Sequence, residues 1–157
     1  MLVFLTICNG NWKGMGSRCM KKLDNFSNCL RILKRADFMR GRDDEIYRTG
    51  IIGQFNLTFE LAWKALQQVL RVHGVVEAET GSPREILQLA YKIGFLEDDE
   101  TWLLMLKQRN LSVHIYNENE INVLLDLIWD KFIPAFLTLE QTLQEKMTGI
   151  QDDDDRS

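Results

Sequence analysis

The stretch FNLTFELAWKALQQVLRV, residues 55–72, decides the fold. Mostly apolar residues recur here at spacings of three and four, and together they form one stripe along a helix. One edge of the stripe consists of Leu57, Leu61, Ala65 and Val69, and it is broadened by Thr58, Ala62, Leu66 and Leu70. This spacing predicts an amphipathic helix. We expect it to span residues 44–73, about 45 Å at about 1.5 Å per residue.

Working outward, the same periodicity predicts further helices over residues 20–40, 82–94, from about 97 to 110, and from about 118 to 145. Ser82 and Pro83 are typical of a helix start, Asp43 or Asp44 can cap the long helix, and Pro134 is expected to kink the last one. No stretch alternates as a strand would. Long helices joined by short loops predict an all-α fold, an up-and-down antiparallel bundle of four to five helices.

Two details of packing follow from single residues. Gly50 and Gly53 lie inside the long helix, where each costs about 1 kcal/mol of helix propensity relative to alanine, so we expect another helix to approach closely there. Tryptophans 63, 102 and 129 are expected to anchor the core.

Composition limits the class of protein. The 157 residues suggest one domain, and a net charge of -4 does not suggest a general nucleic-acid binder. Cys8, Cys19 and Cys29 are odd in number and form no CxxC pair, so a disulfide framework or a metal site is not expected. No apolar run approaches the length of a membrane span. These features favour a cytoplasmic protein.

The two ends read differently from the centre. Residues 1–19 begin with MLVFLTIC and continue with NGNWKGMGSRC, which is typical of irregular coil. We expect them to be either upstream sequence, with Met20 as the natural start, or a poorly ordered leader. Residues 20–146 form the bundle domain, and residues 147–157 are an acidic tail that we expect to be disordered.

An unusual joint lies between the last two helices. RNLSVHIYNENE, residues 109–120, holds Arg109, His114 and Tyr116 within eight residues. On one straight helix His114 would point about 140° away from Arg109. The polar residues of the joint compete with helical backbone bonds. We therefore expect one helix to end near Asn110 and the next to begin near Asn117.

The chemistry of this joint has two interpretations. A histidine with a near-neutral pKa moves protons, and an arginine holds a phosphate in its planar fork. Together they suit phosphodiester cleavage without a metal. Alternatively, Arg109 pairs with a carboxylate and His114 caps a helix end. From spacing alone the second interpretation is the simpler one.

A resemblance adds to this reading. R-N-L-S-V-H-I-Y matches the R-x-x-x-x-H-x-Y signature of the HEPN superfamily. Residues 55–66, residues 82–94 and the spacing from Trp102 to Arg109 resemble the nucleotidyltransferase substrate-binding branch of that superfamily. The similarity spans roughly residues 20–145.

The resemblance implies a homodimeric helical bundle whose partner is a minimal nucleotidyltransferase. HepT-like relatives are ribonuclease toxins, which the partner neutralises by transferring AMP to the motif tyrosine. Carried over, Arg109 and His114 are the catalytic pair on RNA, Tyr116 is the AMP acceptor, and Asn110 supports Arg109. The resemblance implies neither a metal ion nor a cofactor.

Other readings stay open. The chain can be a non-catalytic substrate-binding subunit, which the acidic net charge favours, or a structural bundle without chemistry. Glu60 and Lys64 also match the branch, either as an ion pair at i, i+4 or as part of a pocket beside the joint. His73 is expected to cap a helix C-terminus.

Overall fold

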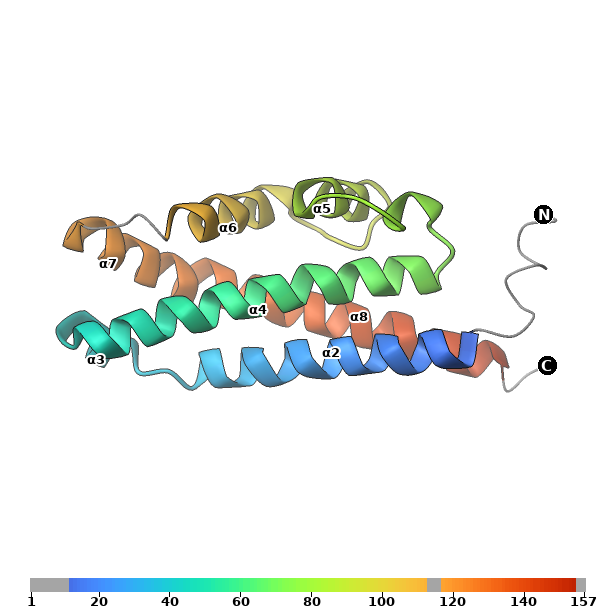
Figure 1. Cartoon of the computed structure of the whole chain (residues 1–157), viewed down its shortest axis with the longest axis horizontal. Coiled ribbons are helices and arrows are strands. Elements are labelled where there is room, and N and C mark those ends of the chain that lie inside the picture. Colours follow the sequence, from blue (N-terminus) through green and yellow to red (C-terminus); the bar gives the residue numbers. More distant parts are fainter. Residues whose placement is uncertain (1–11, 113–116, 155–157) are drawn as a thin grey trace.

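The computed structural model describes residues 12–112 and 117–154, which are almost entirely helical. In chain order the elements are α2 (Trp12–Lys34), α3 (Phe38–Asp43), α4 (Glu45–Val72), the 3-10 turn η1 (Val76–Ala78), α5 (Pro83–Lys92), α6 (Asp99–Leu111), α7 (Glu118–Leu127), the π-helical turn η2 (Ile128–Phe132) and α8 (Ile133–Asp154). Figure 1 shows α2, α4 and α8 side by side along the length of the molecule, with α5 and α6 following one another above α4. The predicted all-α bundle is confirmed.

The helix expected over residues 20–40 is in fact two helices. α2 ends at Lys34, and Asp37 starts α3 by accepting a hydrogen bond from the Arg40 backbone N–H at 3.0 Å. Asp44 then caps α4, its carboxylate accepting from the Tyr47 N–H at 3.0 Å, as one of the two predicted caps. An N-cap aspartate satisfies backbone donors that a helix leaves free. The chain therefore turns twice where we expected one helix end.

Both ends of the bundle are more helical than expected. α2 begins at Trp12 and α8 continues to Asp154, so residues 12–19, where irregular coil was expected, and residues 147–154 are helical in this structure. The two extensions meet: the Cys19 thiol lies 3.4 Å from the Met147 sulfur, and both residues are buried. Apolar contact at this end of the bundle offsets the low helix propensity of the glycines in α2.

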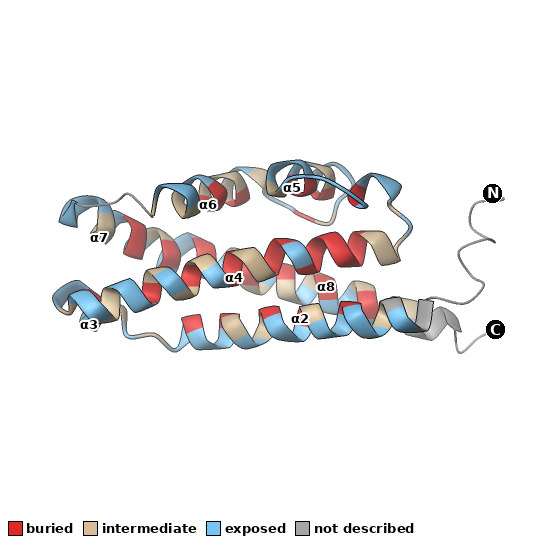
Figure 2. Cartoon of the chain, viewed as in Figure 1, coloured by how far each residue is buried: buried red, intermediate tan, exposed pale blue. Residues whose placement is uncertain are grey.

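The core gathers around Phe136 of α8. Its ring centroid lies 6.0 Å from that of Phe26 in α2, 6.3 Å from Phe55 in α4 and 5.5 Å from Trp102 in α6. One side chain thus contacts three other helices. Figure 2 shows how strongly α4 is buried, especially along its C-terminal half. α4 is the central helix that residues 55–72 predicted.

Two apolar residues expected in the core lie outside it. Leu57 is 48% exposed, because the buried stripe of α4 is centred on Phe55, Phe59 and Leu66 rather than on the Leu57 edge. Trp129 is 54% exposed and packs on the ring of Phe38 at 5.2 Å. The other two expected anchors, tryptophans 63 and 102, are buried as predicted.

The close helix approach occurs at a different glycine. No described atom lies within 4 Å of a Cβ built on Gly50 or Gly53, so the prediction for these residues is wrong within the chain. At Gly41 such a Cβ would lie 2.7 Å from Cδ1 of Ile51. Gly41 is buried where α3 packs against α4. A larger residue at this position would have to displace the terminal methyl group of Ile51.

The last predicted helix is interrupted just before Pro134. In η2 the Ile133 N–H donates to the Ile128 carbonyl, one residue further back than in an α-helix. Proline cannot donate a hydrogen bond and crowds the preceding turn, and a π-helical turn is a common way to accommodate such a defect. The structure thus has a π-helical turn just before Pro134, the residue at which a kink was expected. Among the described helices, none is long and apolar enough to cross a membrane.

Candidate functional site

The joint between α6 and α7 has the predicted boundaries. α6 ends at Leu111, and Arg109 and Asn110 belong to its last turn. α7 begins at Glu118, where the Asn117 side chain accepts from the Asn119 N–H at 2.9 Å. His114 and Tyr116 fall between these helices and lie outside the described residues, so their predicted roles stay predictions.

The middle of α4 lies opposite Arg109. Nη2 of Arg109 lies 3.4 Å from the Glu60 carboxylate, and Nζ of Lys64 lies 3.1 Å from the other oxygen of that carboxylate. Nη1 of Arg109 donates to the Asn110 side-chain oxygen at 3.1 Å. The structure thus brings together Glu60, Lys64, Arg109 and Asn110 from two helices. It shows both the Glu60–Lys64 ion pair and the carboxylate partner of Arg109 that the simpler interpretation expected.

A second polar link holds the end of α6 against α4. The Asn56 side-chain amide donates to the Ser112 hydroxyl at 3.0 Å, and that hydroxyl donates to the Arg109 carbonyl at 2.8 Å. Asn56 lies one turn before Glu60, so the same face of α4 supplies both contacts. Asn56 was not predicted. Its only signal in the sequence is a polar residue four positions before Glu60 beside an apolar stripe.

Glu60 carries a negative charge at the centre of the site. Burial of this carboxyl acts to raise its pKa, but the neighbouring Trp63 indole, Lys64 ammonium and Arg109 guanidinium outweigh it and lower the pKa below its usual value. Cations within a few ångströms favour the charged form of an acid. At neutral pH one carboxylate therefore sits between two cations.

The Trp63 side chain lies beside this carboxylate. It is 9% exposed, and its indole Nε1 makes no hydrogen bond within residues 12–112 and 117–154. The Lys64 ammonium lies 5.8 Å from the centre of its ring. The indole also helps to lower the pKa of the Glu60 carboxyl, so its N–H lies near that carboxylate rather than being free for another acceptor.

Arg109 remains open to solvent despite its partners. Its side chain is 43% exposed, and among the described residues one contact to Glu60 and one to Asn110 occupy only some of the N–H donors of the guanidinium. A planar guanidinium fits the oxygens of a phosphate or a carboxylate. The exposed side of Arg109 can therefore bind an anion while Glu60 holds the other side.

The rest of the described surface offers less chemistry. A shallow pocket lies between the start of α6 and α8, lined by Trp102, Lys131 and Thr138 among others, and includes none of the predicted site residues. In the described part of the chain, no three His, Cys, Asp or Glu side chains gather as metal ligands would. Arg109 and its neighbours remain the best-formed polar cluster at a predicted site.

Known proteins resemble the part of the chain that contains Glu60 and Arg109. Residues 21–145 match the family model described as "nucleotidyltransferase substrate binding protein like". A curated protein of Haemophilus influenzae, "Probable ribonuclease HepT", is 26% identical over 97 residues, which cover 60% of this chain and 66%, just under two thirds, of that protein. A crystal structure of a Thermus thermophilus protein superposes with a TM-score of 0.59 and 28% identity, over 78% of this chain and 98% of that one.

The family match covers most of the chain and includes the helices that carry Glu60 and Arg109. It extends from α2 to within α8, so it includes every helix of the bundle. The fold and the motif agree with it. This chain belongs to the nucleotidyltransferase substrate binding protein like family, as a HepT-like member of the HEPN superfamily.

Proposed function

We propose that this protein is the HEPN-type subunit of a two-component toxin–antitoxin system, a metal-independent ribonuclease toxin whose partner is a minimal nucleotidyltransferase. At the family level, a toxin–antitoxin or nucleotidyltransferase-associated role follows from the matches. One observation carries the finer proposal. Arg109, the first residue of the R-x-x-x-x-H-x-Y motif, is held at the end of α6 with its guanidinium partly open to solvent.

In the proposed reaction, a ribose 2′-hydroxyl of RNA attacks the adjacent phosphorus and the 5′-oxygen of the next nucleotide leaves. His114 moves the proton from the hydroxyl or to the leaving oxygen. Arg109 stabilises the negative charge that develops on the phosphate oxygens. Each role uses the side chain that suits it.

In the proposed control of this activity, the partner transfers AMP from ATP to Tyr116: the phenol oxygen attacks the α-phosphorus, and pyrophosphate leaves. A phenol becomes nucleophilic when a base removes its proton, and His114 or the partner supplies that base. The added nucleotide places negative charge and bulk next to Arg109 and so blocks RNA. A homodimer would bring two Arg109–His114 pairs to one cleft by two-fold symmetry.

Glu60 favours a second candidate function. Its ionised carboxylate occupies one side of Arg109 at 3.4 Å, where it competes with a phosphate. The net charge of -4 also opposes general RNA capture. Both observations support a non-catalytic subunit that presents a substrate, or its own tyrosine, to the nucleotidyltransferase.

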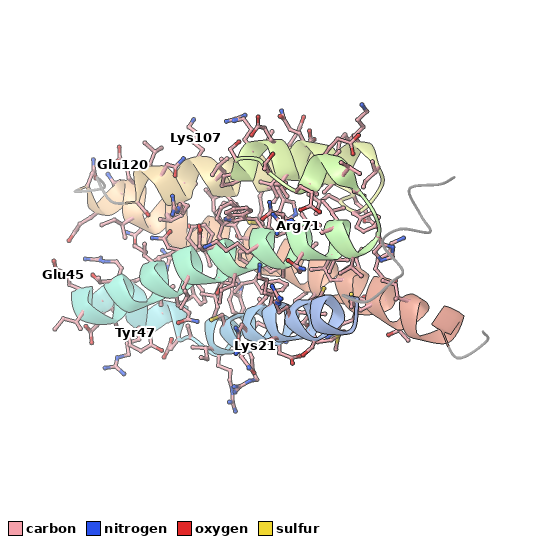
Figure 3. All side chains as sticks on the ribbon, turned by 45° about the vertical axis from the view of Figure 1, so that its right-hand side comes forward. Lys21, Glu45, Tyr47, Arg71, Lys107 and Glu120 are labelled. Carbon is pink, nitrogen blue, oxygen red and sulfur yellow. The ribbon has the colours of Figure 1, made fainter. Side chains whose placement is uncertain are left out.

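Incubation of purified protein with RNA in EDTA separates the two functions. We expect cleavage by the wild type and none by Arg109→Ala or His114→Ala. The matched control is Lys107→Ala, which removes an exposed cation from α6 on the side away from α4 (Figure 3). Cleavage by the wild type and Lys107→Ala alone supports the ribonuclease. Intact RNA in every reaction supports the substrate-binding subunit.

Transfer of AMP needs a separate test. The protein is incubated with ATP and a minimal nucleotidyltransferase, and modified peptides are identified by mass spectrometry. We expect one adenylyl group on Tyr116, none on Tyr116→Phe, and loss of RNA cleavage in the modified protein. Modification at another residue would contradict the assignment of Tyr116.

A further inference from the structure

Three cations meet where α2 packs against α4. On α4, Lys64, Gln68 and Arg71 follow one another at spacings of four and three residues, so they share one face. Lys22 of α2 joins this face, its ammonium lying 3.5 Å from the Gln68 side-chain oxygen. We call Lys22, Lys64 and Arg71 the basic seam.

The cations of the basic seam repel one another. Burial lowers the pKa of Lys22, and the nearby Arg71 and Lys64 lower it further. Among the residues that the structure describes, Lys22 forms no ion pair, and its contact is the neutral amide of Gln68. Keeping like charges together costs free energy. An anion bound between them would remove that cost.

The basic seam is built on fixed supports. Gln68 is 6% exposed, so the group that Lys22 contacts cannot move far. Nε of Arg71 donates to the Ala78 carbonyl at 3.0 Å, and the buried Gln67 amide donates to the same carbonyl at 3.1 Å. Glu79 contacts Arg71 at 3.8 Å but is 63% exposed, where an ion pair is weak. Buried polar residues thus position Arg71 and Lys22.

The basic seam begins beside the proposed catalytic arginine. Glu60 contacts both Lys64 and Arg109, so these two cations flank one carboxylate. From Lys64 to Arg71 the seam continues along α4 for about 10 Å, at about 1.5 Å per residue. A strand bound at Arg109 would therefore have further cations beside its neighbouring phosphates.

We infer that the basic seam is a second phosphate-binding site, which holds the RNA backbone next to Arg109. This inference rests on the proposed ribonuclease function. Lysine ammonium groups bind phosphates as point charges without reading the base, and such contacts dominate affinity for nucleic acids. The seam therefore aligns the strand without selecting its sequence, and gives an acidic protein a local RNA-binding surface.

Lys22 and its neighbour Lys21 allow a matched test. Lys21 is exposed on the side of α2 that faces away from α4 (Figure 3), whereas Lys22 contacts Gln68 of α4. We compare Lys22→Gln with Lys21→Gln in a His114→Ala background, using a fluorescent single-stranded RNA in EDTA between about 50 and 200 mM salt. Binding is followed by fluorescence anisotropy.

Lys22→Gln should weaken binding about tenfold, as expected for one lost hydrogen bond to a charged group. It should also reduce the slope of log K against log salt by about 0.7. Lys21→Gln should change affinity less than about twofold, since an exposed charge away from the seam contributes little. Lys22→Arg should restore binding, which shows that the charge matters, and circular dichroism checks that each variant folds.

The outcomes separate this inference from the proposed function. Equal effects of Lys22→Gln and Lys21→Gln, or no RNA binding, would contradict the inference that the basic seam binds RNA, whether or not the wild type cleaves. RNA binding that depends on Lys22, without cleavage by the wild type, would support the basic seam as an RNA-binding site and contradict the proposed ribonuclease activity. A polyglutamate peptide that binds through Lys22 while RNA does not would assign the surface to an acidic protein and overturn the inference.

Discussion

Glu60 controls how freely Arg109 can bind an anion, because one carboxylate contacts both Arg109 and Lys64. We predict that Glu60→Gln raises the affinity for single-stranded RNA several-fold, on the order of 1 kcal/mol, since a competing negative charge is removed. The measurement is RNA binding in the His114→Ala background. Glu120→Gln is the control, because Glu120 is an exposed acid on α7 (Figure 3).

The opposite result would be informative too. If Glu60→Gln weakened RNA binding, or abolished cleavage with Arg109 otherwise intact, the carboxylate would be needed to position the guanidinium. The competition described for the substrate-binding subunit would then have no basis.

Part of this site was predictable from the sequence. The Glu60–Lys64 pair follows from a spacing of four residues on one helix, and the break after Asn110 follows from its polar residues. The Arg109–Glu60 contact spans 49 positions, so only the packing of α6 on α4 brings it about. The burial of Trp63 depends on the packing between helices as well.

At the scale of elements, α4 contains two glycines without an evident packing role. No described atom lies within 4 Å of a Cβ at Gly50 or Gly53. We predict that Gly50→Ala and Gly53→Ala each raise the free energy of unfolding by about 1 kcal/mol, because alanine favours the helix. Urea unfolding followed by circular dichroism measures this.

Sedimentation of the same variants tests a second role of these glycines. If Gly50 and Gly53 allow close contact between two copies of the chain, their alanine variants should dissociate more readily despite the gain in helix propensity. A loss of stability in both variants at high protein concentration would contradict our prediction.

A histidine at the C-terminus of α4 should make the stability of the fold depend on pH. His73 is the C-cap, as predicted, and its Nε2 lies 3.2 Å from the Lys146 carbonyl of α8. Burial lowers the His73 pKa, and the positive charge of Lys146 adds to this effect. Between the lowered pKa and the ordinary value of about 6.5, the unfolded chain binds more protons than the folded one.

Stability should therefore fall as pH decreases below about 6.5. Urea midpoints between about pH 5 and pH 7.5 measure the effect in the wild type and in His73→Gln, which does not titrate. We expect a smaller loss at low pH in the variant. Identical pH profiles would show that His73 contributes nothing to this dependence.

Element boundaries were less predictable than element type. Residues 20–40 carry one continuous apolar stripe, so only the capping by Asp37 distinguishes two helices from one. The helical ends at residues 12–19 and 147–154 depend on mutual contacts such as Cys19 with Met147. Tertiary packing of this kind overrides weak local propensity.

For the whole molecule, Phe136 is the common contact of α2, α4 and α6. We predict that Phe136→Ala lowers the free energy of unfolding by about 3 to 5 kcal/mol, because it removes a buried ring and leaves a cavity. Thr138→Ala, an exposed site on the same helix, should change it by less than about 0.5 kcal/mol. A cost below about 1 kcal/mol for Phe136→Ala would contradict the central place of this ring.

The bundle as a whole was predictable because its signal is repeated in every helix. Apolar periodicity and short loops determine the class of fold without knowledge of any single contact. The sequence did not indicate which glycine lies closest to a neighbouring helix, since Gly41 faces Ile51 only after α3 has packed on α4.

The π-helical turn η2 sets the rotation of all that follows it. A turn that closes over five residues instead of four is equivalent to one residue inserted into an α-helix. Deleting one residue there, such as Asp130, would restore a regular α-helix and leave the direction of the α8 side chains nearly unchanged. A regular α-helix through the full sequence would instead rotate α8 by about 100° about its own axis. In that regular helix the buried Phe136 and Leu143 would turn away from their neighbours, so the π-helical turn keeps the apolar side of α8 directed at the core.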